Sequence, residues 1–115
     1  MKITWERTVI GGETETGDFV AVVEGEVVGR IYPYLVGPKK GYYWTFQLGH
    51  GEFRKAHLSG IVDTKQEAAD KVKAEFARWL EYPHEQGGGK DLPIKYWSPG
   101  SIAYSKALKD REGKD

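Results

Sequence analysis

The chain has 115 residues, of which 39% are apolar and 30% charged, so it can close one modest hydrophobic core but not two. It contains no cysteine, which excludes disulfides, thiolate nucleophiles and sulfur-ligated zinc sites. Seventeen basic and seventeen acidic side chains cancel, so the whole molecule has no net charge to attract a polyanion. No run of about 18 apolar residues is present, and the N-terminus becomes charged at Glu6 and Arg7. We therefore expect a cytoplasmic protein that does not enter membranes.

The first third of the chain shows strand patterns. Residues 2–9 alternate apolar and polar side chains, which predicts a half-buried strand. A loop is expected next, and the β-branched run at residues 19–23 suits a central strand. Glu24-Gly25 then predicts a tight hairpin turn into a strand at residues 26–36. Because Pro33 cannot donate to a ladder, we expect a bulge or a sheet edge there.

The next strand is marked by aromatic side chains. A Gly-Pro turn at residues 36–41 precedes it. Within it, four apolar residues alternate with three others: Tyr42, Trp44, Phe46 and Leu48 with Tyr43, Thr45 and Gln47. Residues 49–60 read as a long loop, with a short strand at residues 58–62 returning toward the sheet.

One helix follows the strands. Thr64 and Glu67 have the spacing of a reciprocal capping box, and Tyr82-Pro83 ends the pattern. Between these points an apolar stripe recurs at helical spacing: Ala68, Ala69, Val72, Phe76, Trp79 and Leu80. The predicted fold class is therefore α+β, with an antiparallel sheet of three to four strands packed on one long helix at about residues 64–81.

We expect a single domain over residues 1–115. Residues 1–82 form the core of meander and helix, and residues 83–91 form a flexible connector because Gly87, Gly88 and Gly89 are consecutive. Residues 92–110 are too apolar for a solvated tail, so we expect this segment to dock. Ser98-Pro99 predicts a short helix that runs to about Lys109.

Several segments between Trp5 and Leu80 carry a family resemblance: ITWER, EGEVVGRIYPY, the Gly-Pro turn, YYWTF and SGIVDTKQEAADKVKAEFARWL. They resemble a group of small bacterial proteins of unknown function, mostly proteobacterial or prophage-borne. Members carry a G-R-I strand, a W-x-F/W strand and an S-G-x-x-x-T-x-x-E-A entry into one helix. The resemblance implies a β-β-β-α order and no catalytic residue. A weaker likeness, T-x-x-E-A after three strands, is to HicB-type antitoxin domains, and nothing past His84 matches either group.

A candidate binding face follows from alternation in two strands. If Trp44 faces the helix, Tyr43 turns to the other side of the sheet. In the neighbouring strand, placing Val27, Ile31 and Leu35 inward turns an arginine and two tyrosines outward. The predicted site, with a basic rim from two flanking loops, comprises Arg30, Tyr32, Tyr34, Lys39, Lys40, Tyr43, Arg54 and Lys55.

Three alternatives remain for what covers this face: the C-terminal segment, a partner protein, or single-stranded nucleic acid. Nucleic acid would stack its bases on the tyrosine rings and place its phosphates along the basic rim. The zero net charge disfavours nucleic acid, because phosphate contacts dominate such affinity. We expect a non-enzymatic protein–protein interaction module without a cofactor, such as a phage-borne inhibitor of a host system of the anti-CRISPR type. A second copy of the chain, forming a homodimer, is a further alternative for the partner.

A metal-dependent enzyme is the remaining alternative. It would require His50, Glu52, His57 and Asp63 to converge as ligands, although their spacing matches no established metal site.

Overall fold

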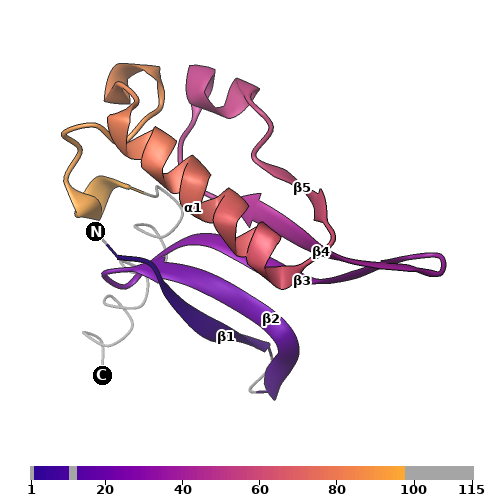
Figure 1. Cartoon of the computed structure of the whole chain (residues 1–115). Helices are drawn as coiled ribbons and strands as arrows, with labels where there is room; N and C mark the ends of the chain where they lie inside the picture. Colours follow the sequence, from indigo (N-terminus) through magenta and orange to yellow (C-terminus); the bar gives the residue numbers. More distant parts are fainter. Residues whose placement is uncertain (1, 11–12, 98–115) are drawn as a thin grey trace, which may run out of the picture.

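The computed structural model describes residues 2–10 and 13–97, which form five antiparallel strands and one α-helix (Figure 1). The strands are β1 (Thr4–Ile10), β2 (Glu13–Val23), β3 (Glu26–Val36), β4 (Lys39–Phe46) and β5 (Ser59–Val62). They pair in chain order in one open sheet. The helix α1 (Lys65–Glu81) packs on β3, β4 and β5. Three short 3-10 helices complete the described chain: η1 (Gly51–Lys55), η2 (His84–Gln86) and η3 (Ile94–Tyr96).

The predicted α+β class, an antiparallel sheet on one long helix, is confirmed. The expected number of three to four strands is too low, because the sheet has five strands. The short strand predicted at residues 58–62 is present as β5, which joins the sheet as an edge strand beside β4. The loop predicted before residue 19 is also wrong in part, since β2 already begins at Glu13.

Tight turns set the order of the strands. Glu24 and Gly25 have φ values of +48° and +84°, as a type I′ hairpin turn requires, so the predicted turn between β2 and β3 is confirmed. Gly37 has φ +59° in the turn between β3 and β4. These connections are short enough to make each strand the neighbour of the next.

Pro33 divides β3 into two parts. The β3–β4 ladder passes through the Pro33–Tyr42 pair without a shift, so no bulge is present on this side of Pro33. The β2–β3 ladder ends at Phe19–Ile31, so β3 is a sheet edge on that side at Pro33, which is the second of the two predicted alternatives. The Pro33 ring lies against Gly17, where a Cβ would be 2.9 Å from Pro33 Cγ. Beyond this point β3 and β4 continue as a two-stranded arm that projects from the sheet (Figure 1).

Two inward residues predicted for β3 are corrected. A register shift between Ala21 and Val22 leaves Val28 as an extra residue, and Val28 rather than Val27 is buried. A β-bulge changes the alternation on one side of itself, which explains the error. Leu35 is 68% exposed because it lies in the projecting arm, beyond the reach of α1.

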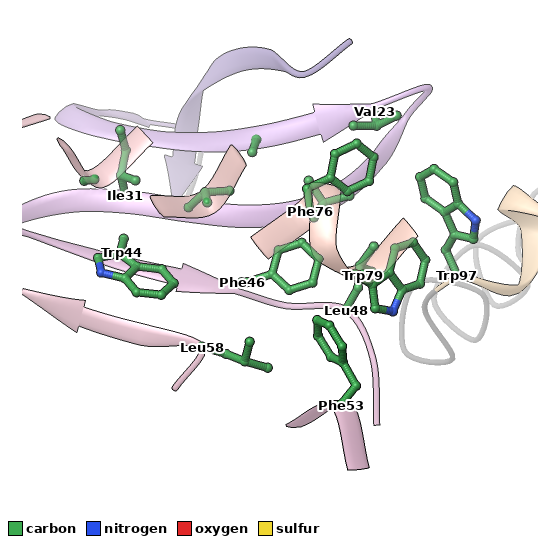
Figure 2. Close-up of a cluster of buried hydrophobic side chains, with 14 residues drawn as sticks. Val23, Ile31, Trp44, Phe46, Leu48, Phe53, Leu58, Phe76, Trp79 and Trp97 are labelled. Carbon is green, nitrogen blue, oxygen red and sulfur yellow. The ribbon is translucent and has the colours of Figure 1, made fainter. Parts of the chain in front are cut away.

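The core lies between the sheet and α1. Trp44, Phe46 and Leu48, which lie on β4 and its extension, belong to one buried cluster with the helix residues Phe76 and Trp79 (Figure 2). The Phe46 and Trp79 ring centroids are 6.3 Å apart. The helix approaches the sheet closely over Gly29, where a Cβ would lie 2.6 Å from Val72 Cγ1.

The start of α1 is capped as predicted, with one difference. The Thr64 hydroxyl accepts a hydrogen bond from the Glu67 backbone N–H at 3.1 Å. The Glu67 carboxylate accepts from the same hydroxyl at 3.1 Å, rather than from the backbone N–H of a reciprocal capping box.

The glycine-rich segment is a packed turn and not the flexible connector that we expected. Gly87, Gly88 and Gly89 are all buried. The Gly89 N–H donates to the Trp79 carbonyl at 2.8 Å, and the Gly87 carbonyl accepts from the Trp79 indole N–H at 3.2 Å. Consecutive glycines are needed here for close approach, because a Cβ at any of the three would overlap neighbouring atoms.

The docking expected for residues 92–110 can be followed as far as Trp97. Trp97 is 2% exposed, and its ring centroid lies 5.2 Å from that of Trp79 and 5.8 Å from that of Phe76 (Figure 2). Leu92 and Ile94 are partly buried against the same core. This part of the segment therefore packs on the helix side of the sheet. Residues 98–110, with the predicted helix from Ser98 to Lys109, lie outside the described residues.

Candidate functional site

Three tyrosines gather on the sheet face opposite α1. Trp44 is 6% exposed beneath the helix, and its neighbour Tyr43 turns to the other face, as predicted. Tyr32 is the direct cross-strand partner of Tyr43, and their ring centroids are 5.1 Å apart at an interplanar angle of 33°. Tyr34 lies diagonally across, with its centroid 6.2 Å from that of Tyr43. Tyr43 therefore holds the centre of a preformed aromatic cluster.

Ile61 extends this cluster and was missed in the sequence. It is the cross-strand partner of Tyr43, so both side chains lie on the same face, and it is 51% exposed. Alternation within β5 is too short to assign a face, and only pairing with β4 does so. We call Tyr32, Tyr34, Tyr43 and Ile61 the tyrosine face.

Arg30 borders the tyrosine face. Its guanidinium carbon lies 4.8 Å from the Tyr32 ring centroid. Its Nε donates to Asp18 Oδ1 at 2.9 Å and its Nη2 donates to Asp18 Oδ2, in a bidentate ion pair. Asp18 is buried and also accepts from the Thr8 hydroxyl at 2.6 Å. The positive charge of Arg30 is therefore compensated within the sheet.

This ion pair predicts a pH dependence of stability. The hydrogen bonds from Arg30 lower the pKa of Asp18 below 3.8, opposed by burial and assisted by Thr8. A lowered folded-state pKa contributes stability above about pH 4, which is lost as the pH falls through the folded-state pKa. Asp18→Asn should cost about 1–3 kcal/mol at pH 7, and the difference from wild type should shrink toward pH 2.

Urea unfolding at several pH values measures this difference, with the exposed turn residue Glu24→Gln as the control. A stability difference between wild type and Asp18→Asn that stays constant down to pH 2 would contradict the assigned ion pair.

The two lysines of the predicted rim lie in the projecting arm. Both are exposed, but they are consecutive in β4, so their side chains point to opposite faces. Lys39 shares the side of Tyr43, whereas Lys40 is paired with Leu35 on the other side.

The other two basic residues of the predicted rim lie beyond the opposite end of β4. Arg54 Nη1 donates to the carbonyls of Phe46 and Leu48 at 3.3 and 3.1 Å. Lys55 Nζ is 2.7 Å from Glu52 Oε1. The length of β4, about 3.4 Å per residue, separates this pair from the arm. The structure therefore brings Arg30, Tyr32, Tyr34 and Tyr43 together, but it does not assemble the four remaining residues into one basic rim.

His50 and His57, the two histidines that were considered as metal ligands, are both exposed. Over residues 2–10 and 13–97, no group of three or more His, Cys, Asp or Glu side chains lies close enough to hold a metal ion. Within the same ranges, no helix combines the length and the apolar character needed to span a bilayer.

Comparison of the chain with protein-family models, curated proteins and solved structures gives no match. The resemblance to the prophage-borne group stays a prediction.

Proposed function

We propose that this chain is a non-enzymatic binding protein that docks another protein on its tyrosine face. The observation that carries the proposal is the cluster in which the Tyr32 and Tyr34 rings both lie against Tyr43, beside the exposed Ile61, on the sheet face opposite α1. Tyrosine supplies a large and rigid contact area at low cost in conformational entropy and is enriched in protein interfaces. Rings that are already packed together lose little further freedom when a partner binds.

Single-stranded nucleic acid is the weaker candidate for the same face. Binding of this kind needs cations along the phosphate path next to the stacked bases. Arg30 is engaged by Asp18, and Lys39 and Lys40 point to opposite sides of the arm. Arg54 and Lys55 lie past the other end of β4. The arrangement therefore offers rings without a continuous basic track.

The kind of partner follows from the sequence resemblance alone. Small prophage-borne proteins without catalytic residues are suited to inhibiting a host system. We therefore propose that this chain inhibits a host defence system. Such a partner would be met in the cytoplasm.

Affinity capture from a bacterial lysate tests the proposal by comparing three forms of the protein. Wild type and Tyr96→Ser should retain the same host protein, because Tyr96 is an exposed tyrosine in η3, away from the tyrosine face. The double variant Tyr34→Ser/Tyr43→Ser should lose it while remaining folded by circular dichroism.

Two outcomes would reject the proposal. One is equal retention of the host protein by the double variant. The other is recovery of nucleic acid whose binding falls steeply with salt, which would favour the weaker candidate.

A further inference from the structure

The strand β5 is an open edge of the sheet. It pairs with β4 on one side only and forms the margin of the sheet (Figure 1). The Phe46 N–H donates to the Leu58 carbonyl at 2.8 Å, and in an antiparallel ladder every second residue bonds to the same neighbour. Gly60 therefore bonds to β4, whereas the backbone N–H and C=O groups of Ser59 and Ile61 point away from it. In the part of the chain that the structure describes, no backbone hydrogen bond other than those of the β4 ladder reaches β5.

The opposite edge of the sheet carries features that discourage pairing with another strand. The strand β1 contains the exposed charged residues Glu6 and Arg7, and its register with β2 shifts between Arg7 and Val9. Charges and bulges of this kind protect edge strands. The strand β5 has neither a charged residue nor a proline, and its apolar residue Ile61 is 51% exposed. Its length of four residues limits the size of an interface but does not block one.

The outward backbone groups of β5 determine what can bind there. An edge with alternating N–H and C=O groups is matched by another extended backbone, and β5 of a second copy of the chain supplies one. The paired stretch 58–62 has Gly60 at its centre, so antiparallel pairing of two copies about Gly60 overlaps the whole stretch. In this register Ser59 of each copy faces Ile61 of the other, and each such pair exchanges both of its N–H···O hydrogen bonds.

The side chains that flank β5 are complementary in the same register. Pairing about Gly60 brings His57 of each copy opposite Asp63 of the other, because both lie three residues from the centre. Both side chains are exposed, and within residues 2–10 and 13–97 neither forms an ion pair. An imidazole N–H donates to a carboxylate in either protonation state of the ring. Registers centred on Ser59 or on Ile61 would move the two side chains out of direct opposition.

We propose that two copies of the chain pair through β5, antiparallel and about Gly60, into one continuous sheet. Ile61 of each copy then lies diagonally across the ladder from Ile61 of the other, on the side of the tyrosine face. Because an added strand extends a sheet in its own plane, the two α1 helices stay on one side and the two tyrosine faces adjoin on the other. The pairing does not depend on the proposed function.

Sedimentation velocity of the full-length chain tests the proposal. The interface of a short strand is small, so we expect a monomer–dimer equilibrium with a dissociation constant between about 10 µM and 1 mM. Ser59→Pro removes an outward N–H and no bond to β4, and an edge strand tolerates proline where its nitrogen faces solvent. We expect this variant to raise the dissociation constant at least about tenfold. Ser59→Ala is the matched control, because it keeps the N–H, and it should dimerise within about twofold of wild type.

Hydrogen exchange of the wild type gives a second readout that needs no substitution. The amide hydrogens of Ser59 and Ile61 should exchange at least about fivefold more slowly at 1 mM than at 10 µM, while that of the turn residue Glu24 keeps its rate. If Ser59→Pro fails to fold, as judged by its urea midpoint, this measurement decides. Three results would overturn the proposal: a monomer over the whole range, a dimer that a folded Ser59→Pro leaves unchanged, or exchange at Ser59 and Ile61 that does not depend on concentration.

Discussion

Replacing Gly87 by alanine is expected to lower the free energy of unfolding by about 3–5 kcal/mol. Gly87 has φ +98°, a conformation that side chains with a Cβ rarely adopt. A Cβ at this position would also overlap the carbonyl oxygen of His50, and a backbone atom cannot move aside as a flexible side chain can. The same turn places the Gly87 carbonyl on the Trp79 indole, so the strain would reach the centre of the core.

Gly25→Ala provides the matched control for this substitution. Gly25 also has a positive φ, +84°, but a Cβ there meets nothing within 4 Å. The free energy of unfolding of this variant should therefore fall only by the cost of the strained backbone conformation, about 1–2 kcal/mol. Urea unfolding followed by tryptophan fluorescence measures both variants. Equal losses at the two glycines would show that residues 87–89 are not packed as described.

Tyr43→Ala is expected to weaken binding to the recovered partner at least about 30-fold, or about 2 kcal/mol. Tyr43 lies between Tyr32 and Tyr34 and opposite Ile61, so its removal breaks every ring contact of the tyrosine face at once. Residues at the centre of an interface typically carry most of the binding free energy. The fold should persist, because one cross-strand pair contributes only about 0.2–1 kcal/mol.

Titration of the purified partner into each variant, followed by calorimetry, measures this loss. Tyr96→Ala, outside the tyrosine face, should bind within about twofold of wild type. Equal weakening by Tyr43→Ala and Tyr96→Ala would place the binding surface elsewhere.

Alternation in the sequence was sufficient to predict the two faces of β4. Trp44 and Phe46 are buried and Tyr43 lies outside, because a regular strand keeps a period of two. The same reasoning failed for Val27, since the bulge that leaves Val28 buried in its place depends on the register with β2. Periodicity describes one strand, whereas a bulge is a property of two paired strands.

Composition misled us where the meaning of a residue depends on its neighbours. Consecutive glycines predict flexibility when nothing surrounds them, but at residues 87–89 they permit contact with the end of α1 and with His50. The four basic residues of the predicted rim are close in sequence, yet the length of β4 separates them into two pairs. Lys39 and Lys40 are consecutive in β4, so their side chains point to opposite faces of the arm. The location of the tyrosine cluster was therefore predictable, and its electrostatic surroundings were not.

Hydroxyl-radical footprinting of the free protein, read by mass spectrometry, tests most directly whether an open tyrosine face lies opposite the helix. We predict oxidation of Tyr34, which is 38% exposed, and of Tyr43, with Trp44 protected and Tyr96 oxidised as the internal reference. Protection of both Tyr34 and Tyr43 to the level of Trp44 would contradict the account, because the face would then be covered. Oxidation of Trp44 with protection of Tyr43 would contradict it as well, since the sheet would then present its other side to the helix.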